Sequence, residues 1–231
     1  METTLYVSLG LAALFLVSLT PIGLNFRRWM MVQMYEKVQL KYEAHVGDRK
    51  RELLADLSGT VLEIGPGNGA NFQYLPNTIS NWIGIEPNPY MHGPLRTAGE
   101  ERGIPTDFRE VTAEGMHVED ESVDAVLSTL VLCSVSDPAG VVRDIHRSLK
   151  PGGRFVFLEH VAAPRGTRLR RLQGLLNPVW GYFADGCHLN RELAEIIGSA
   201  GFAEVQVEEF TVPKEVGPSV VSRQVAGVAI K

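Results

Sequence analysis

The feature that most constrains the fold is residues 61–72, where an apolar run leads directly into three alternate glycines, in the order VLEIGPGNGANF. The apolar run is typical of a buried strand, and a helical pattern follows the glycines. Gly65, Gly67 and Gly69 allow backbone conformations that side chains disfavour and let the chain approach a ligand closely. The segment therefore predicts a strand, a tight loop and a helix whose free N–H groups face a bound small molecule.

Two acidic residues indicate the chemistry of that molecule. Gly65, Gly67 and Ala70 also match the fingerprint of NAD-binding proteins, so the glycines alone leave an oxidoreductase open. Glu63, two residues before the first glycine, would repel a pyrophosphate but could pair with an ammonium group. Glu86 ends the next apolar run, where a carboxylate accepts both hydroxyls of a ribose. Together the two acids favour a cationic ligand that carries an adenosine.

The order of the predicted elements indicates an α/β fold. Helical segments such as 138–149 separate short strand-like runs at residues 60–64, 81–85, 107–111, 123–130 and 154–160. That alternation is typical of a parallel sheet covered by helices. Two further runs, at 205–210 and 225–230, have only loop signals between them and predict an antiparallel pair at one edge. With 231 residues, 45% of them hydrophobic and 21% charged, the chain has the composition of one globular core.

The N-terminal region predicts an anchor. Residues 5–24 carry no charge, and as a helix they are long enough to cross the ~30 Å hydrocarbon layer of a membrane. Arg27 and Arg28 follow this run, so we expect residues 1–28 to anchor the chain with the remainder in the cytosol. The Pro-Ile-Gly sequence at 21–23 leaves open whether the anchor spans the bilayer or lies in one leaflet.

The next residues link the anchor to the folded domain. Residues 29–57 have apolar side chains at helical spacing and predict one or two amphipathic helices, with a break at Gly47. We expect these helices to link the anchor to a domain that covers residues 58–231 and, with Tyr35 and Tyr42, to form a lid over its binding site. Simple packing of the two tyrosines is the alternative.

Charge and cysteine content exclude several other classes. The net charge of −5 offers no basic surface for a nucleic-acid backbone, so we expect no nucleic-acid partner. Cys133 and Cys187 lie 54 positions apart, without the short Cys and His spacings of metal sites. We therefore expect neither a disulfide framework nor a bound metal.

Four motifs, in order, resemble those of the class I S-adenosylmethionine-dependent methyltransferases. They are the glycine segment with Glu63, the acid Glu86, the element 112–114 before 120–124, and residues 149–153 before a strand. The chain is also similar to the membrane-bound methyltransferase-like seven group, the microsomal thiol S-methyltransferases, in its anchor and on segments 69–72, 87–89, 129–135, 159–163 and 185–187. It departs from that group at Pro66, Asn68, 165–173 and 217–224, differences that concern the acceptor more than the cofactor.

The resemblance implies a Rossmann-like sheet of seven strands, the last antiparallel, with S-adenosylmethionine as cofactor. The methionine end would lie near the glycine loop and Thr129–Leu130, the ribose on Glu86, and the adenine beside Ala113 and Glu114. The residues expected to contact the cofactor are Glu63, Gly65, Pro66, Gly67, Asn68, Gly69, Asn71, Glu86, Pro87, Asn88, Ala113, Glu114, Thr129 and Leu130.

The resemblance also implies an activity and a location. It predicts methyl transfer to a small lipophilic thiol, by a domain that faces the cytosol from the endoplasmic reticulum membrane or a lipid droplet. The residues themselves leave two alternatives open. One is transfer to oxygen, nitrogen or carbon of a lipid or quinone, and the other is a lipid-droplet protein that retains the fold without catalysis.

Catalytic groups have only weak signals, because attack by a thiolate needs alignment and at most one base. Asp185 and His188, in the loop DGCHLN, are the candidates to accept the thiol proton. The same polar groups can equally satisfy the loop's own backbone. Four arginines between 165 and 171, interleaved with leucines, predict a basic amphipathic helix that contacts a membrane surface, with a solvated face as the alternative.

Overall fold

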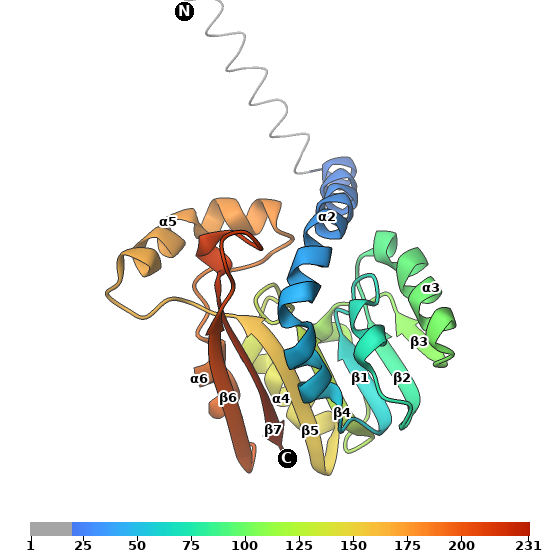
Figure 1. The fold of residues 1–231 in the computed structure, drawn as a ribbon. Coiled ribbons are helices and arrows are strands. Elements are labelled where there is room, and N and C mark those ends of the chain that lie inside the picture. Colours follow the sequence, from blue (N-terminus) through green and yellow to red (C-terminus); the bar gives the residue numbers. More distant parts are fainter. Residues whose placement is uncertain (1–19) are drawn as a thin grey trace, which may run out of the picture.

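A computed structural model describes residues 20–231, and its centre is a sheet of seven strands (Figure 1). In spatial order the strands are β3 (Thr106–Arg109), β2 (Ile79–Ile85), β1 (Gly59–Ile64), β4 (Val123–Thr129), β5 (Leu149–His160), β7 (Arg223–Ile230) and β6 (Glu204–Thr211). The strands from β3 to β5 run parallel, whereas β7 runs antiparallel to β5 and β6. The predicted class of sheet, with its last strand antiparallel, is confirmed.

Helices cover both faces of the sheet. One face packs against α2 (Pro21–Leu54), α3 (His92–Arg102) and the short helix η1 (Ala70–Tyr74). The other face packs against α4 (Pro138–Ser148), α6 (Leu193–Gly198) and the short helix η3 (Ala113–Gly115). Helix α5 (Arg168–Phe183) lies beyond the strand ends, at the same end of the molecule as the first turns of α2 (Figure 1). Two more short helices, η2 (Pro89–Met91) and η4 (Ser219–Val221), lie in connections.

The apolar or polar character of each strand depends on whether helices cover its faces. Strands β1 and β4 are buried over most of their length because helices lie on both of their faces, which explains their continuous apolar runs. Strand β6 is exposed along most of its length and forms one edge of the sheet. Its acidic side chains Glu204, Glu208 and Glu209 discourage another chain from pairing with that edge.

Helix α2 differs from the prediction of a break at Gly47. The helix begins at Pro21, where the Thr20 side chain accepts a hydrogen bond from the Gly23 N–H, and it continues to Leu54. Gly47 is buried inside it, and a Cβ there would lie 3.1 Å from the Tyr74 hydroxyl. The predicted break is therefore wrong, because this glycine lets α2 approach η1 closely instead of ending the helix.

The predicted anchor lies largely outside the described residues, which exclude 1–19. Within residues 20–231, the helices are all too short or too polar to cross a bilayer. Residue 28, where the sequence places the end of the anchor, is inside α2, and the helix passes through it without interruption. The division of the chain at that residue stays a prediction.

A buried ion pair joins two side chains of α2, Lys50 and Glu43. Lys50 Nζ lies 2.7 Å from Glu43 Oε1, and the two side chains are 3% and 9% exposed. Burial lowers the pKa of Lys50, and the carboxylates of Glu43 and Glu63 oppose that shift. The lysine therefore offsets two acids that the core has removed from water.

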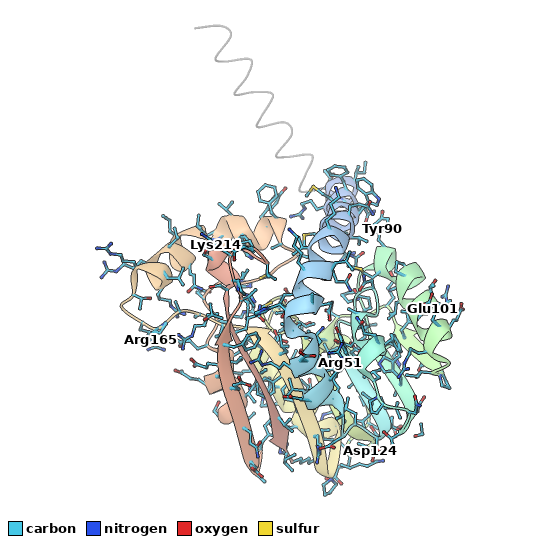
Figure 2. The ribbon with its side chains drawn as sticks, in the orientation of Figure 1. Arg51, Tyr90, Glu101, Asp124, Arg165 and Lys214 are labelled. Carbon is cyan, nitrogen blue, oxygen red and sulfur yellow. The ribbon has the colours of Figure 1, made fainter. Side chains whose placement is uncertain are left out.

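We expect Lys50→Met to lower the free energy of unfolding by about 3–5 kcal/mol, because it leaves the Glu43 carboxylate buried and unpaired. The double variant Lys50→Met/Glu43→Leu should recover most of the loss, since it removes the charge as well. Urea unfolding followed by circular dichroism measures both. Arg51→Met, at the exposed neighbouring residue labelled in Figure 2, is the control and should change stability by about 0.5 kcal/mol or less. A Lys50→Met variant as stable as the parent would contradict the prediction.

Candidate functional site

A cavity of about 500 Å³ lies at the carboxyl ends of the parallel strands. Its floor includes Gly65 after β1, Glu86 after β2, Leu130 after β4 and His160 at the end of β5. Strands β1 and β4 are neighbours whose connections leave in opposite directions, and ligands of open α/β sheets bind at that divergence.

Three segments close the cavity from above. Helix α2 contributes Arg28, Met31, Val38, Gln39 and Tyr42, and the loop after α5 contributes Ala184, Asp185 and Cys187. The third is the connection between β6 and β7, which contributes Val212, Val216, Gly217, Pro218, Val221 and Ser222. The Tyr42 hydroxyl donates a 2.7 Å hydrogen bond to Gln224 Oε1 and so ties α2 to β7 across the opening. Residues of α2 thus line the cavity, while the role of 29–57 as a lid stays a prediction. The β6–β7 wall had no signal in the sequence.

The glycine loop follows β1 as the sequence predicts. Gly65 has φ +60°, and a Cβ there would lie 2.5 Å from Val131 Cγ2. Its N–H donates to the carbonyl of Ile85 at 2.8 Å, so the loop is held against the end of β2. A side chain at this position would have to move the loop that follows β4.

Glu86 lies in the cavity wall and is 6% exposed. Its two carboxylate oxygens accept hydrogen bonds from the backbone N–H groups of Gly67, at 2.9 Å, and Asn88, at 2.8 Å. Burial raises the pKa of Glu86, and these two bonds oppose the shift. Each oxygen can accept a further bond, so the carboxylate can receive the hydroxyls of a ribose.

Glu63 lies behind the glycine loop and does not line the cavity. Its oxygens accept from Asn71 Nδ2 at 2.7 Å and Trp82 Nε1 at 2.9 Å. Burial raises the pKa of Glu63, while Asn71, Trp82 and Lys50 oppose the shift. The geometry differs from the direct pairing with an ammonium that the sequence predicts: here the acid holds the loop from behind, and its contact with a cofactor stays a prediction.

The other expected cofactor residues divide into two groups. Those that line the cavity with Gly65 and Glu86 are Pro87, Asn88, Ala113, Glu114 and Leu130. Those that lie away from its wall with Glu63 are Pro66, Gly67, Asn68, Gly69, Asn71 and Thr129. Asn68 pairs with the amide of Gln39 on α2, and Asn71 Nδ2 also donates to Thr129 Oγ1 at 3.2 Å. The second group therefore fixes the loop in this structure, and its contacts with a cofactor stay predictions.

The two predicted proton acceptors, Asp185 and His188, differ in whether they reach the cavity. Asp185 is exposed, has φ +48° and lines the cavity. His188 is half-buried and does not line it, and its Nδ1 is buried without a hydrogen-bond partner among the described residues. The backbone N–H of His188 donates to the carbonyl of Cys133 at 2.8 Å. Of the pair, only Asp185 can reach a ligand in the cavity without a rearrangement of the loop.

The fold brings together three residues that the sequence spacing did not connect. The donor atoms of Cys133, His160 and Cys187 all lie within 4.8 Å of one another, and all three residues line the cavity. The sequence spacing therefore missed the proximity of these three side chains, and the expected absence of a metal stays a prediction. A signal was available, because Cys133 follows β4 and His160 ends β5, and the carboxyl ends of these two strands meet at this edge. Cys187 arrives from the loop after α5, which spacing alone does not place.

The cluster has unusual acid–base properties. A hydrogen bond with Cys133 lowers the pKa of Cys187 to about 4, helped by His160 and by the indole N–H of Trp180 and opposed by burial. The same sulfur–sulfur contact, with burial, raises the pKa of Cys133. Burial lowers the pKa of His160, but the sulfur of Cys187 and the carboxylate of Glu159 outweigh it, so the pKa is raised. The cavity wall thus holds two thiol groups and an imidazole in close contact, and the contact favours ionisation of Cys187 over Cys133.

Comparison with known proteins shows that the chain is similar to methyltransferases. Residues 62–157 match the methyltransferase domain family. The chain is 36% identical to the thiol S-methyltransferase TMT1B of Rattus norvegicus over 220 residues, which cover 89% of this chain and 88% of that protein. It is 37% identical to the human thiol S-methyltransferase TMT1A over 183 residues, or 74% and 75% of the two chains.

A solved structure shares the fold. It is a crystal structure of an S-adenosylmethionine-dependent methyltransferase, possible histamine N-methyltransferase, from Thermotoga maritima, with a TM-score of 0.62 and 23% identity. The match covers 88% of this chain and 99% of that one.

We expect Glu86→Ala to weaken the binding of S-adenosylhomocysteine by about 1–3 kcal/mol, or roughly 5- to 150-fold in the dissociation constant. The reason is the loss of a buried carboxylate that faces the cavity and orders the backbone of Gly67 and Asn88. Isothermal titration calorimetry measures the change. Glu101→Ala, an exposed acid on α3 labelled in Figure 2, is the matched control and should bind as the parent does. An unchanged dissociation constant for Glu86→Ala would place the ribose elsewhere.

Proposed function

Because this chain belongs to the thiol S-methyltransferase family of S-adenosylmethionine-dependent methyltransferases, we propose that it methylates a small lipophilic thiol at a membrane surface. The observation that carries the proposal is the division of the cavity. One part has the backbone and carboxylate groups of Gly65 and Glu86, and the other has apolar side chains from α2, α5 and the β6–β7 connection. The first part suits an adenosine and an amino acid, and the second suits a hydrocarbon.

The residues present fit S-adenosylmethionine. A buried acid with free acceptor capacity, Glu86, stands where a ribose is expected, and Gly65 leaves a cradle that a Cβ would fill. Ala113 and Glu114, on η3, form the adjoining wall and suit an adenine. When bound, this cofactor supplies a methyl group on a positively charged sulfur.

The protein itself contributes to the reaction by excluding water from the cavity and by aligning the thiol with the cofactor. Tyr42, Val38 and Met31 of α2 cover the cavity and limit the access of water. An apolar environment favours a transfer in which a thiolate and a sulfonium both lose their charge. Holding the two sulfur compounds in line supplies most of the rate, in favourable cases about 7–11 kcal/mol. Asp185, exposed at the wall, is the chain's predicted acceptor for the thiol proton.

The membrane part of the proposal rests on one end of the molecule. Arg27 Nη1 donates a 2.7 Å hydrogen bond to the carbonyl of Tyr182, and its guanidinium lies 4.1 Å from the centre of the Tyr182 ring. These contacts join the first turns of α2 to the end of α5. Large apolar side chains are exposed on both helices there: Ile22, Phe26, Trp29, Leu172, Leu175, Val179 and Phe183. We call this set the apolar end, and it suits a lipid surface.

The arginines near α5 have different roles. Arg165 and Arg170 pair with Glu192, at 2.6 and 3.2 Å, and so hold the helix on the domain. Arg168 and Arg171 are exposed, and no ion pair is recorded for either among residues 20–231. Those two are suited to anionic lipid headgroups. Since Arg28 and Trp180 line the cavity beside the apolar end, a lipophilic acceptor can enter from the membrane. The location we propose is the cytosolic face of the endoplasmic reticulum or a lipid droplet.

The acceptor class is tested with labelled S-adenosylmethionine and matched series of alkanethiols, alkanols, alkylamines and phenols. We expect transfer to thiols only, and a KM that falls about fourfold for each added CH₂ group that the apolar wall buries. Transfer to phenols or amines at equal rates would favour the alternative of a lipid or quinone methyltransferase. Failure to bind S-adenosylhomocysteine at all would favour a protein without catalysis.

Membrane contact is tested on the full chain with vesicles that contain anionic lipid. We expect Leu175→Asp/Val179→Asp to lower the partition coefficient, since each charge would have to enter the headgroup region. Val207→Asp changes an exposed valine on β6, outside the apolar end, and is the matched control. Equal partitioning of all three proteins would exclude α5 from the contact.

A further inference from the structure

Three sulfur and nitrogen donors meet in the wall of the cavity, and the proposed transfer by itself gives them no role. Cys133 and His160 are buried, and Cys187 is half-buried. The Nε2 atom of His160 lies 3.6 Å from the Sγ atom of Cys187, and all three donor atoms lie within 4.8 Å of one another. Two thiol groups and an imidazole are soft and borderline ligands, typical of zinc sites.

The spacing of the donors fits a tetrahedral ion. With Zn–S near ~2.3 Å and Zn–N near ~2.0 Å, two ligands of such an ion lie ~3.6 to ~3.8 Å apart. The measured separation of His160 Nε2 and Cys187 Sγ is 3.6 Å, and the third donor is within a small side-chain movement of the same distance. Two thiolates also balance the charge of one Zn²⁺, so the loaded cluster would be neutral in this largely buried place.

The donors are held in position by the surrounding chain. Glu159 Oε1 accepts hydrogen bonds from the N–H groups of Val131, at 3.0 Å, and Leu132, at 3.1 Å, which fixes the turn that carries Cys133. The loop of Cys187 is held on that turn by the 2.8 Å bond from the His188 N–H to the Cys133 carbonyl. The indole of Trp180 donates to Cys187 Sγ at 3.2 Å. The backbone of His188 also bonds to the His160 imidazole, an arrangement that orients metal-binding histidines.

We propose that Cys133, His160 and Cys187 bind one Zn²⁺ ion whose fourth coordination position opens into the cavity and receives the sulfur of the acceptor. Three protein ligands and one open position are the pattern of catalytic rather than structural zinc sites. All three ligands line the same cavity as Glu86 and Gly65, so the open position faces the space of the proposed reaction. The metal site stands on its own geometry, whereas the role of its open position rests on the proposed thiol transfer.

The step balances without a further reactant. The acceptor thiol loses its proton to Asp185, which is exposed and passes it to solvent, as its sulfur binds the metal, because metal ligation stabilises the thiolate. An electron pair of that sulfur then forms the bond to the methyl carbon, and the bond from this carbon to the cofactor's sulfur breaks. The products are a neutral thioether and S-adenosylhomocysteine, and a thioether binds zinc more weakly than a thiolate does.

The metal content of the purified full chain, incubated with Zn²⁺ under reducing conditions and then dialysed, tests the site. We expect about one zinc per chain by atomic emission. Replacement of zinc by Co²⁺ should give a thiolate-to-cobalt charge-transfer band, and an alkanethiol should change that band whereas the matched alkanol should not. Cys133→Ser and Cys187→Ser should each lower the zinc content by about tenfold or more.

Two controls separate loss of the ligand from loss of the fold. His188→Ala removes a histidine next to Cys187 that is outside the donor cluster, so it should keep its zinc. Binding of S-adenosylhomocysteine by both serine variants shows whether the domain remains folded.

Several outcomes would overturn the inference. A wild-type chain that takes up neither zinc nor cobalt, or that holds its cysteines as a disulfide and stays metal-free after reduction, has no such site. If that metal-free chain still methylates thiols, the proposed function stands without the metal. If an alkanethiol leaves the cobalt charge-transfer band unchanged, the metal site stands, but the inference that its open position receives the acceptor sulfur is refuted.

Discussion

The position of the glycine loop depends on one buried carboxylate, Glu63, which is 1% exposed and must find its hydrogen-bond partners within the protein. Trp82 from β2 and Asn71 from η1 both donate to it, so the acid joins the sheet to the loop's far end. Lys50 of α2, itself paired with Glu43, offsets the charge. The helix that covers the cavity and the loop that forms its floor are therefore stabilised by the same group of buried charges.

The cavity combines two chemical environments that come from different parts of the chain. Its polar end is formed by the first half of the sheet, where Gly65 and Glu86 follow adjacent parallel strands. Its sulfur-containing and apolar end is formed by β5, the loop after α5 and the β6–β7 connection. The methyltransferase domain family matches residues 62–157, which include the polar end, whereas the acceptor that we propose depends on the second end.

Local sequence patterns were sufficient to predict much of the fold, because strands and turns depend mainly on residues close together in the chain. Alternating apolar runs predicted all seven strands, and the loop at Pro213–Pro218 separated the antiparallel pair correctly. Gly47 was misread because a glycine that ends a helix and a glycine that lets a helix approach a tyrosine have the same local sequence. The proximity of the two cysteines was missed for a related reason. Their spacing of 54 residues carries no information about Cys133 and Cys187 until the connections of the sheet are known.

The sequence by itself determined the parallel sheet, the glycine loop after its first strand and the acid at the end of its second, since each depends on neighbours in the chain. Only the tertiary structure decided which of these groups reach a ligand. It turned Glu63 behind the loop, brought Asp185 to the cavity wall without His188, and assembled Cys133, His160 and Cys187 at one point. The reason is that a strand's direction follows from local geometry, whereas the meeting of one strand end and two loops depends on how every connection between them packs.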